Sequence, residues 1–165
     1  MKNLMAKMFQ AGEPMDTSTA FRILRIIHLA MCSSVFVDGF LVYLLLTQGI
    51  MPEKGFVGDF PHVSMLRTVL WALAAGCVVT IRIIRARFLS VEALRRRATH
   101  VAQAINAVHI VMFAVAVSIA IYGLLLFMIG AFLEDFLVLA GLSLLMLYWL
   151  RPKQDEYHSL VRAVR

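Results

Sequence analysis

Four long apolar segments constrain this chain more than any other feature of its sequence. They lie at about residues 21–47, 62–84, 101–129 and 132–150. The hydrocarbon core of a bilayer is about 30 Å thick, and a helix needs roughly 20 apolar residues to cross it. The segments are continuously apolar and far longer than the roughly 10-residue strands of a membrane barrel. They predict an all-α polytopic membrane protein, an up-down bundle of four transmembrane helices.

The composition and the segments flanking the spans complete this prediction. Hydrophobic residues make up 61% of the chain and charged residues 16%, whereas soluble domains typically have about 45–50% and about 25%. An ordinary soluble domain is therefore excluded. We expect an interfacial N-terminal segment over 1–20, a transmembrane domain over 21–150 with a basic connector over 85–100, and a basic tail over 151–165.

The basic residues predict the orientation. All 16 lysines and arginines except Lys54 and Arg67 fall on one side of the predicted membrane. By the positive-inside rule both termini are cytoplasmic, and with no targeting extension apparent we expect a multi-pass protein of the cell inner membrane. Arg95, Arg96 and Arg97 are predicted to contact lipid headgroups, where each basic residue gains about 1 kcal/mol. No nucleic-acid reader motif accompanies them, so nucleic acid is not an expected partner.

Loop lengths and small residues indicate how the helices pack. The last two spans are joined by a few residues around Gly130, and short connections favour antiparallel neighbours. Ala72 and Gly76 are four residues apart, as are Ala116 and Ala120. Small residues at this spacing let membrane helices approach closely, so both pairs are predicted to lie at helix contacts.

Two ionisable residues fall inside predicted spans, where such residues are costly and often functional. Asp38 lies about eight residues from the outer end of the first span, and Arg67 about five residues from the outer end of the second. The two helices are antiparallel neighbours in this prediction. Asp38 and Arg67 are therefore expected either to form an ion pair or to leave Asp38 as a protonatable, ion-carrying group.

Two histidines provide the second candidate site. His28 in the first span and His109 in the third lie at similar depth on the cytoplasmic side, and each has a methionine three residues later. Such a pair can ligate b-type haem from opposite faces, bind a quinone, or hold a soft metal with the methionines. The other interpretation is an interhelical hydrogen-bond network that includes Gln103 and Asn106, which share a helical sector with His109.

The sequence shows no catalytic motif. It has no Gly-rich phosphate loop, no nucleophile elbow and no HExxH pattern. Cys32 and Cys77 both fall within spans, where thiols usually behave as small hydrophobic groups. We therefore predict no catalytic residues, no metal site and no cofactor in the leading interpretation.

One segment of the third span resembles a known family. The residues Ala120-Ile121-Tyr122-Gly123-Leu124-Leu125 resemble the phrase around the ion-carrying helix of rotary ATPase proteolipid (c-type) subunits, especially the V-type ones with four spans in two hairpins. The resemblance implies a proteolipid-like architecture. In that family a carboxylate precedes the phrase by three residues; here Val117 takes that place, so the ion-binding acid is missing.

Three functions are consistent with these features. The leading one is a non-catalytic accessory or structural subunit of a membrane complex, whose partners are membrane lipid and either another membrane protein or further copies of this chain. The first alternative is an electron-transfer bundle that binds haem b or quinone through His28 and His109. The second is a proteolipid-like protein that translocates ions or protons through Asp38.

Overall fold

The computed structural model describes residues 16–52, 55–57, 62–90, 92 and 101–164. These residues form helices and connections, without a strand, which confirms the all-α prediction. The helices are α2 (Thr17–Thr47), α3 (Val63–Phe88), α5 (Val101–Gly130), α6 (Leu133–Trp149) and α7 (Gln154–Val164). Three of them, α2, α3 and α5, are long and apolar enough to cross a membrane, and α6 with α7 passes the same test as a pair bent by 54°.

Some predictions concern segments outside the described residues. The interfacial segment expected over 1–20 falls mostly on residues 1–15, and the predicted headgroup contacts of Arg95, Arg96 and Arg97 fall within 93–100. These stay predictions.

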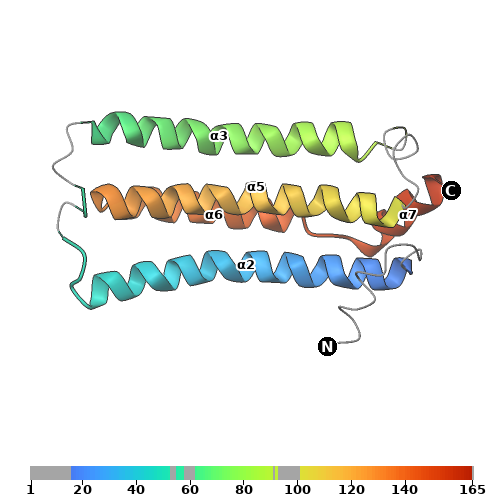
Figure 1. Cartoon of the computed structure of the whole chain (residues 1–165), viewed down its shortest axis with the longest axis horizontal. Helices are drawn as coiled ribbons and strands as arrows, with labels where there is room; N and C mark the ends of the chain where they lie inside the picture. The colour runs from blue at the N-terminus through green and yellow to red at the C-terminus, as the bar shows by residue number, and fades with distance from the viewer. Residues whose placement is uncertain (1–15, 53–54, 58–61, 91, 93–100, 165) are drawn as a thin grey trace.

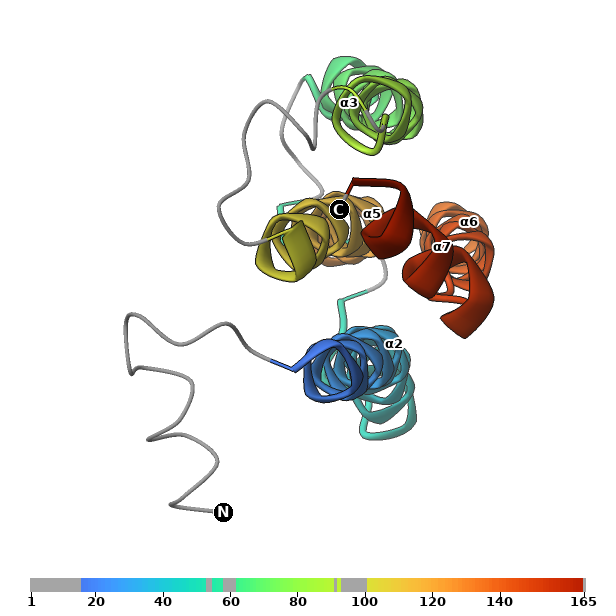
Figure 2. The same ribbon diagram turned by 90° about the vertical axis from the view of Figure 1, so that its right-hand side faces the viewer.

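Helix α5 is the centre of the arrangement. It lies between α3 and α2 in Figure 1, and the end-on view in Figure 2 shows α6 beside it. Half of the most apolar stretch of α5 is buried, compared with 11% for α2 and 17% for α3. A helix that is apolar on every side is suited to such a central position. Below, the end where α2 begins and α7 lies is called the α7 end, and the opposite end is called the loop end.

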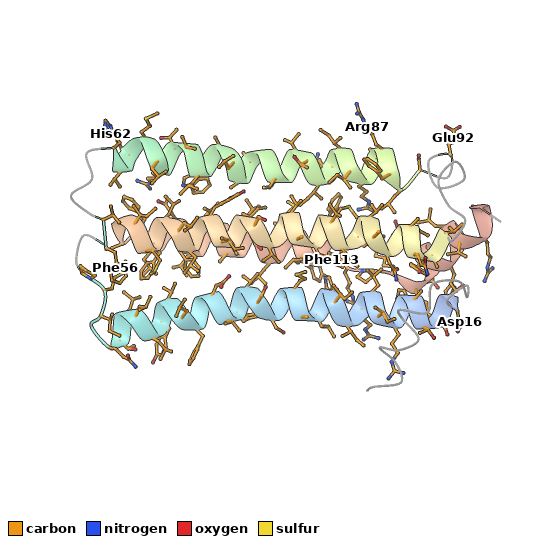
Figure 3. All side chains as sticks on the ribbon, viewed as in Figure 1. Asp16, Phe56, His62, Arg87, Glu92 and Phe113 are labelled. Carbon is orange, nitrogen blue, oxygen red and sulfur yellow. The ribbon has the colours of Figure 1, made fainter. Side chains whose placement is uncertain are left out.

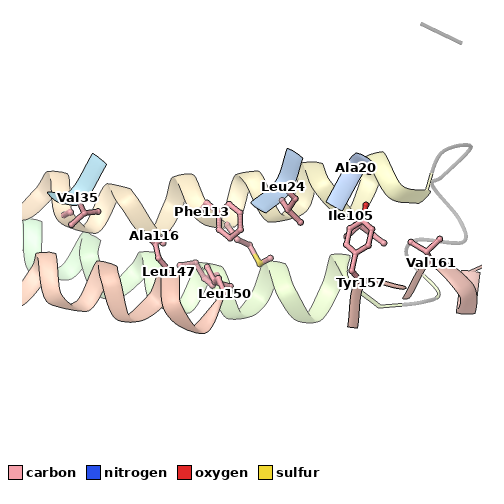
Figure 4. Packing of buried hydrophobic residues seen from close by; sticks show 13 residues of the cluster. Ala20, Leu24, Val35, Ile105, Phe113, Ala116, Leu147, Leu150, Tyr157 and Val161 are labelled. Atoms are coloured by element: carbon pink, nitrogen blue, oxygen red, sulfur yellow. The ribbon is translucent and has the colours of Figure 1, made fainter. Parts of the chain in front are cut away.

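The largest buried cluster joins all of the helices at the α7 half of the molecule. Figure 4 shows part of it, with Phe113 and Ala116 of α5 facing Leu147 of α6. Ala116 and Ala120 are fully buried, which confirms the predicted close packing there. Ala72 and Gly76 are exposed on α3, so the corresponding prediction for that pair is wrong: this side of α3 does not face α5.

Three boundaries differ from the sequence prediction, one of them because α3 continues to Phe88, four residues into the predicted connector. Helix α2 begins at Thr17 rather than 21, directly after Asp16, whose carboxylate accepts a hydrogen bond from the Ser18 hydroxyl. This bond lowers the pKa of Asp16. The predicted basic tail contains helix α7, whose Tyr157 and Val161 lie four residues apart and are buried against the other helices.

The connection between α2 and α3 is hydrogen-bonded to the end of α5. The backbone N–H groups of Phe56 and Val57 donate to the carbonyls of Met128 and Ile129 at 3.0 and 3.2 Å. The last carbonyls of a helix have no partner within the helix, so the connection supplies donors that α5 lacks. Gly55 makes the approach feasible: its φ is +79°, and a Cβ there would lie 2.6 Å from the Ile129 carbonyl carbon.

Helices α5 and α6 approach each other closely at Gly123. A Cβ built on Gly123 would lie 3.0 Å from Leu139 Cβ and 3.2 Å from Phe136 Cα. We expect Gly123→Ala to lower the free energy of unfolding by about 1–3 kcal/mol, because the added methyl group overpacks the contact. The measurement is unfolding of the purified protein in mixed detergent micelles, followed by circular dichroism.

Gly141 on α6 provides the matched control, because a Cβ there meets no atom within 4 Å. Gly141→Ala should leave the protein as stable as the wild type or slightly more so, since alanine favours the helix. Equal losses in both variants would contradict the close-packing interpretation of Gly123.

Candidate functional site

A charged cluster joins α3 to the start of α6 at the loop end. Arg67 Nη2 donates to Asp135 Oδ1 at 2.9 Å, and Arg67 Nε lies 2.7 Å from Oδ2. Trp71 Nε1 donates to the same Oδ1 at 3.2 Å. The Arg67 guanidinium also stacks 4.9 Å from the centre of the Phe132 ring. Asp135 lies in the first turn of α6, where a negative charge suits the helix dipole.

This geometry corrects the predicted ion pair between Asp38 and Arg67. Arg67 binds Asp135 instead, because α5 lies between α2 and α3 (Figure 2) and places the second span beside α5 and α6. A pair between Asp38 and Arg67 would require the first two spans to be neighbours. The connection from Gln48 to His62 is long enough to join two helices that are not neighbours.

Asp38 is left without a partner in the described part of the chain. It lies inside the apolar helix α2, it is partly buried, and no hydrogen bond or ion pair involves its carboxyl group there. Its neighbours Val37 and Phe40 are exposed apolar residues. Of the two residues predicted to pair with each other, Arg67 is therefore paired with Asp135, and Asp38 has no partner among the described residues.

The rings of His28 and His109 both pack against the ring of the same phenylalanine, Phe113. The ring of Phe113 on α5 lies 5.1 Å from the centre of the His28 ring and 6.1 Å from that of His109. Figure 3 labels Phe113 in the middle of the molecule, and its side chain is fully buried. The similar depth predicted for His28 and His109 thus corresponds to a shared aromatic neighbour.

Each histidine also bonds to a backbone carbonyl. His28 Nε2 lies 2.9 Å from Leu147 O of α6, and His109 Nδ1 lies 2.9 Å from Ile105 O in its own helix. Leu147 O lies in the last turn of α6, where carbonyls lack helical donors. The N–H of Arg151, which would complete that bond, donates to Tyr148 O instead. The His28 Nε2–H group therefore donates to a carbonyl that has no donor within α6. His28 could ligate iron through Nε2 only if this hydrogen bond were broken.

Asn106 provides a second polar link between helices. Its Nδ2 donates to Ala20 O of α2 at 2.9 Å, and its Oδ1 accepts a hydrogen bond from the Tyr157 hydroxyl of α7 at 3.1 Å. Asn106 thus belongs to an interhelical network as predicted, whereas Gln103, predicted to join it, is exposed. Ser143 of α6 forms a further link through its bond to Ala116 O at 2.8 Å.

A pocket of about 110 Å³ opens at the α7 end, where α3, α5 and α7 meet the end of α6. Three basic side chains line it, Arg85, Arg151 and Lys153, together with one acidic side chain, Glu156. Arg85 pairs with Glu156 at 3.2 Å and stacks 4.6 Å from the centre of the Trp149 ring. The sequence predicted no site here, although Trp149 followed by Arg151 and Lys153 is a pattern typical of a membrane interface.

Comparison with known proteins adds no assignment. No family model matches the chain, and no match was found among curated proteins or solved structures. The resemblance of residues 120–125 to proteolipid subunits therefore stays a prediction. Within the described ranges, no group of three or more His, Cys, Asp or Glu side chains is placed to hold a metal ion.

The cluster at the loop end predicts an asymmetric response to mutation. The Asp135 side chain is 6% exposed and that of Arg67 is 47% exposed. Arg67→Gln should lower the free energy of unfolding by about 3 kcal/mol, because it leaves a buried carboxylate without its cation. Asp135→Asn should cost less, since Arg67 lies near the start of α3 and its long side chain can extend toward the membrane surface.

A double-mutant cycle measured by detergent unfolding checks the pairing. Arg67→Gln and Asp135→Asn should be strongly coupled, whereas Arg67→Gln and Asp38→Asn should have additive effects, as residues without a shared partner usually do. Coupling between the changes at Asp38 and Arg67, with none between Arg67 and Asp135, would contradict this arrangement.

The bond from His28 predicts which replacements are tolerated. His28→Gln should keep most of the stability, because an amide can donate to Leu147 O in place of the imidazole. His28→Leu should lower the free energy of unfolding by about 1–3 kcal/mol, because it strands that carbonyl in an apolar setting. Equal stability of the two variants would show that the bond contributes little.

The visible spectrum of the same preparations tests the haem alternative, which stays a prediction. A Soret band with sharp reduced α and β bands in the wild type, lost in His28→Gln and in a His109→Gln variant, would show that the histidines are axial ligands. A protein without such a band in any variant is the expected result.

Proposed function

We propose that the chain is a multi-pass inner-membrane protein that serves as a non-catalytic accessory or structural subunit of a membrane complex. The observation that carries this proposal is Asp38, a carboxyl group within an apolar helix that has no partner among the described residues. An ionisable group inside a membrane normally pairs with another group or faces a polar path. A donor from a neighbouring transmembrane helix would satisfy it.

The surroundings of Asp38 suit a helix contact. Gly39 follows it, and a Cβ at Gly39 would meet no atom within 4 Å. Small residues allow a second helix to come close in a membrane. The occupant that fits is a transmembrane helix with a basic or hydrogen-bonding side chain at matching depth.

The proposed topology has four spans with both termini in the cytoplasm. Its support is the reversal of chain direction between successive long helices in Figure 1. Further support comes from the described basic residues, which gather at the α7 end; Arg87 is labelled there in Figure 3. Arg67 lies near the start of α3, at the loop end. This asymmetry favours a cytoplasmic α7 end.

The other consistent role is ion or proton translocation through Asp38. The same unpaired carboxyl group favours it, since a group that carries a proton must be free to release it. The two roles differ in what the loss of the carboxyl group changes: assembly in one case and flux in the other.

Replacement of Asp38 by leucine tests the proposed subunit role. Asp38→Leu should leave the isolated protein at least as stable as the wild type, because it removes an unpaired polar group from an apolar helix. It should also shift the protein, in native gels of mildly solubilised membranes, from a larger assembly to the size of the free chain. Val37→Leu, at an adjacent position that is 63% exposed, is the control and should keep the assembly.

Two results would count against the subunit role. One is wild-type protein that migrates as the free chain. The other is a proton flux in proteoliposomes that Asp38→Asn abolishes while stability and native size are unchanged, which would favour translocation.

A further inference from the structure

The pocket at the α7 end is the strongest unassigned feature of the molecule. Its basic residues come from two separate segments: Arg85 from the last turn of α3, and Arg151 and Lys153 from the link between α6 and α7. Glu156 is the one acidic side chain that lines it, and Arg85 already pairs with Glu156. Positive charge is therefore in excess at the mouth of the pocket.

Arg151 and Lys153 are available for an external anion. Both are exposed, and neither makes an ion pair within the described part of the chain. Pro152 between them fixes one backbone dihedral angle, and the axes of α6 and α7 differ by 54° at this link. The two cations therefore project from a bent, constrained link rather than from a continuous helix.

Apart from His109 and the Tyr157 hydroxyl, the rest of the lining is apolar. Leu89, Met112, Leu150 and Leu160 contribute hydrocarbon surface, and the Trp149 ring lies under the Arg85 guanidinium. Tryptophan is enriched where a membrane meets water, and Trp149 ends the apolar helix α6. The pocket thus combines an anion-binding rim with an apolar wall at the boundary of the apolar helices.

We propose that this pocket binds the phosphate headgroup of an anionic phospholipid, with Arg151 and Lys153 contacting the phosphate and Trp149 and Leu160 contacting the start of the acyl chains. Basic pockets between transmembrane helices on the cytoplasmic side suit such headgroups. A volume of about 110 Å³ admits a phosphate group, and the acyl chains would then extend along the apolar wall. Free inorganic phosphate shares the headgroup chemistry but would make no use of the apolar wall.

The test uses the fluorescence of Trp149 in the full-length chain purified in dodecyl maltoside. The chain has two tryptophans, so a Trp71→Phe background makes Trp149 the sole reporter. Phosphatidylglycerol should change its emission saturably. Phosphatidylcholine, which has no net charge, and inorganic phosphate should not produce that change.

The double variant Arg151→Gln with Lys153→Gln should weaken phosphatidylglycerol binding about 30-fold. This corresponds to the loss of two contributions of about 1 kcal/mol each, at about 1.4 kcal/mol per tenfold change in affinity. The matched control is Arg22→Gln with Arg25→Gln, which removes two exposed basic residues of α2 at the same end of the molecule but outside the pocket. It should change the affinity less than twofold.

Native mass spectrometry of the wild-type chain provides a second measurement that does not depend on the Trp71→Phe background. It should show one retained phosphatidylglycerol, which the pocket double variant loses and the α2 control keeps. Equal losses in the two double variants would overturn the proposal in favour of diffuse charge attraction. Saturation of the Trp149 signal by inorganic phosphate alone, or equal binding of phosphatidylcholine, would also overturn it.

Discussion

The enclosure of α5 by the other helices is the constraint on which the rest of this structure depends. A helix that contacts several neighbours in an apolar setting cannot be held in register by the hydrophobic effect alone, because lipid tails are as apolar as its side chains. Close packing and hydrogen bonds must do so. Gly123 brings α6 within direct contact of the α5 backbone, and Asn106, Ser143 and His28 each link one helix to a backbone carbonyl of another.

The buried polar side chains differ from Asp38, which is only partly buried, in how they are satisfied. Most are engaged with a carbonyl or a charge on a neighbouring helix, as Asp135 is with Arg67. These contacts define the angles and registers of the helices. Asp38 is different, since it has no such partner in the part of the chain that the structure describes. The proposed contact with a partner helix is therefore on α2, at the one carboxyl group of this helix that lacks a partner among the described residues.

The sequence was sufficient for the class of structure and for most helix boundaries, because long apolar runs have few other solutions in a membrane. It was not sufficient for the choice of neighbours. Asp38 and Arg67 are complementary only if α2 and α3 are adjacent. The uniformly apolar sequence of α5 indicates a central helix, but it does not show that α5 separates α2 from α3. The partner of Arg67 could have been suspected, since Asp135 lies at a matching depth in the first turn of α6. The pocket depends on the bend at Pro152, which composition does not reveal.

The position of α5 also bears on how the chain is assembled during synthesis. Helices α2 and α3 are made first, yet the packing described for each of them is against α5 and α6. The last carbonyls of α5 in turn depend on Phe56 and Val57 from the earlier connection. Because α2 and α3 pack against these later helices and not against each other, neither can complete the packing described here until α5 and α6 have been made. The later half of the chain thus supplies the packing surface on which both earlier helices depend.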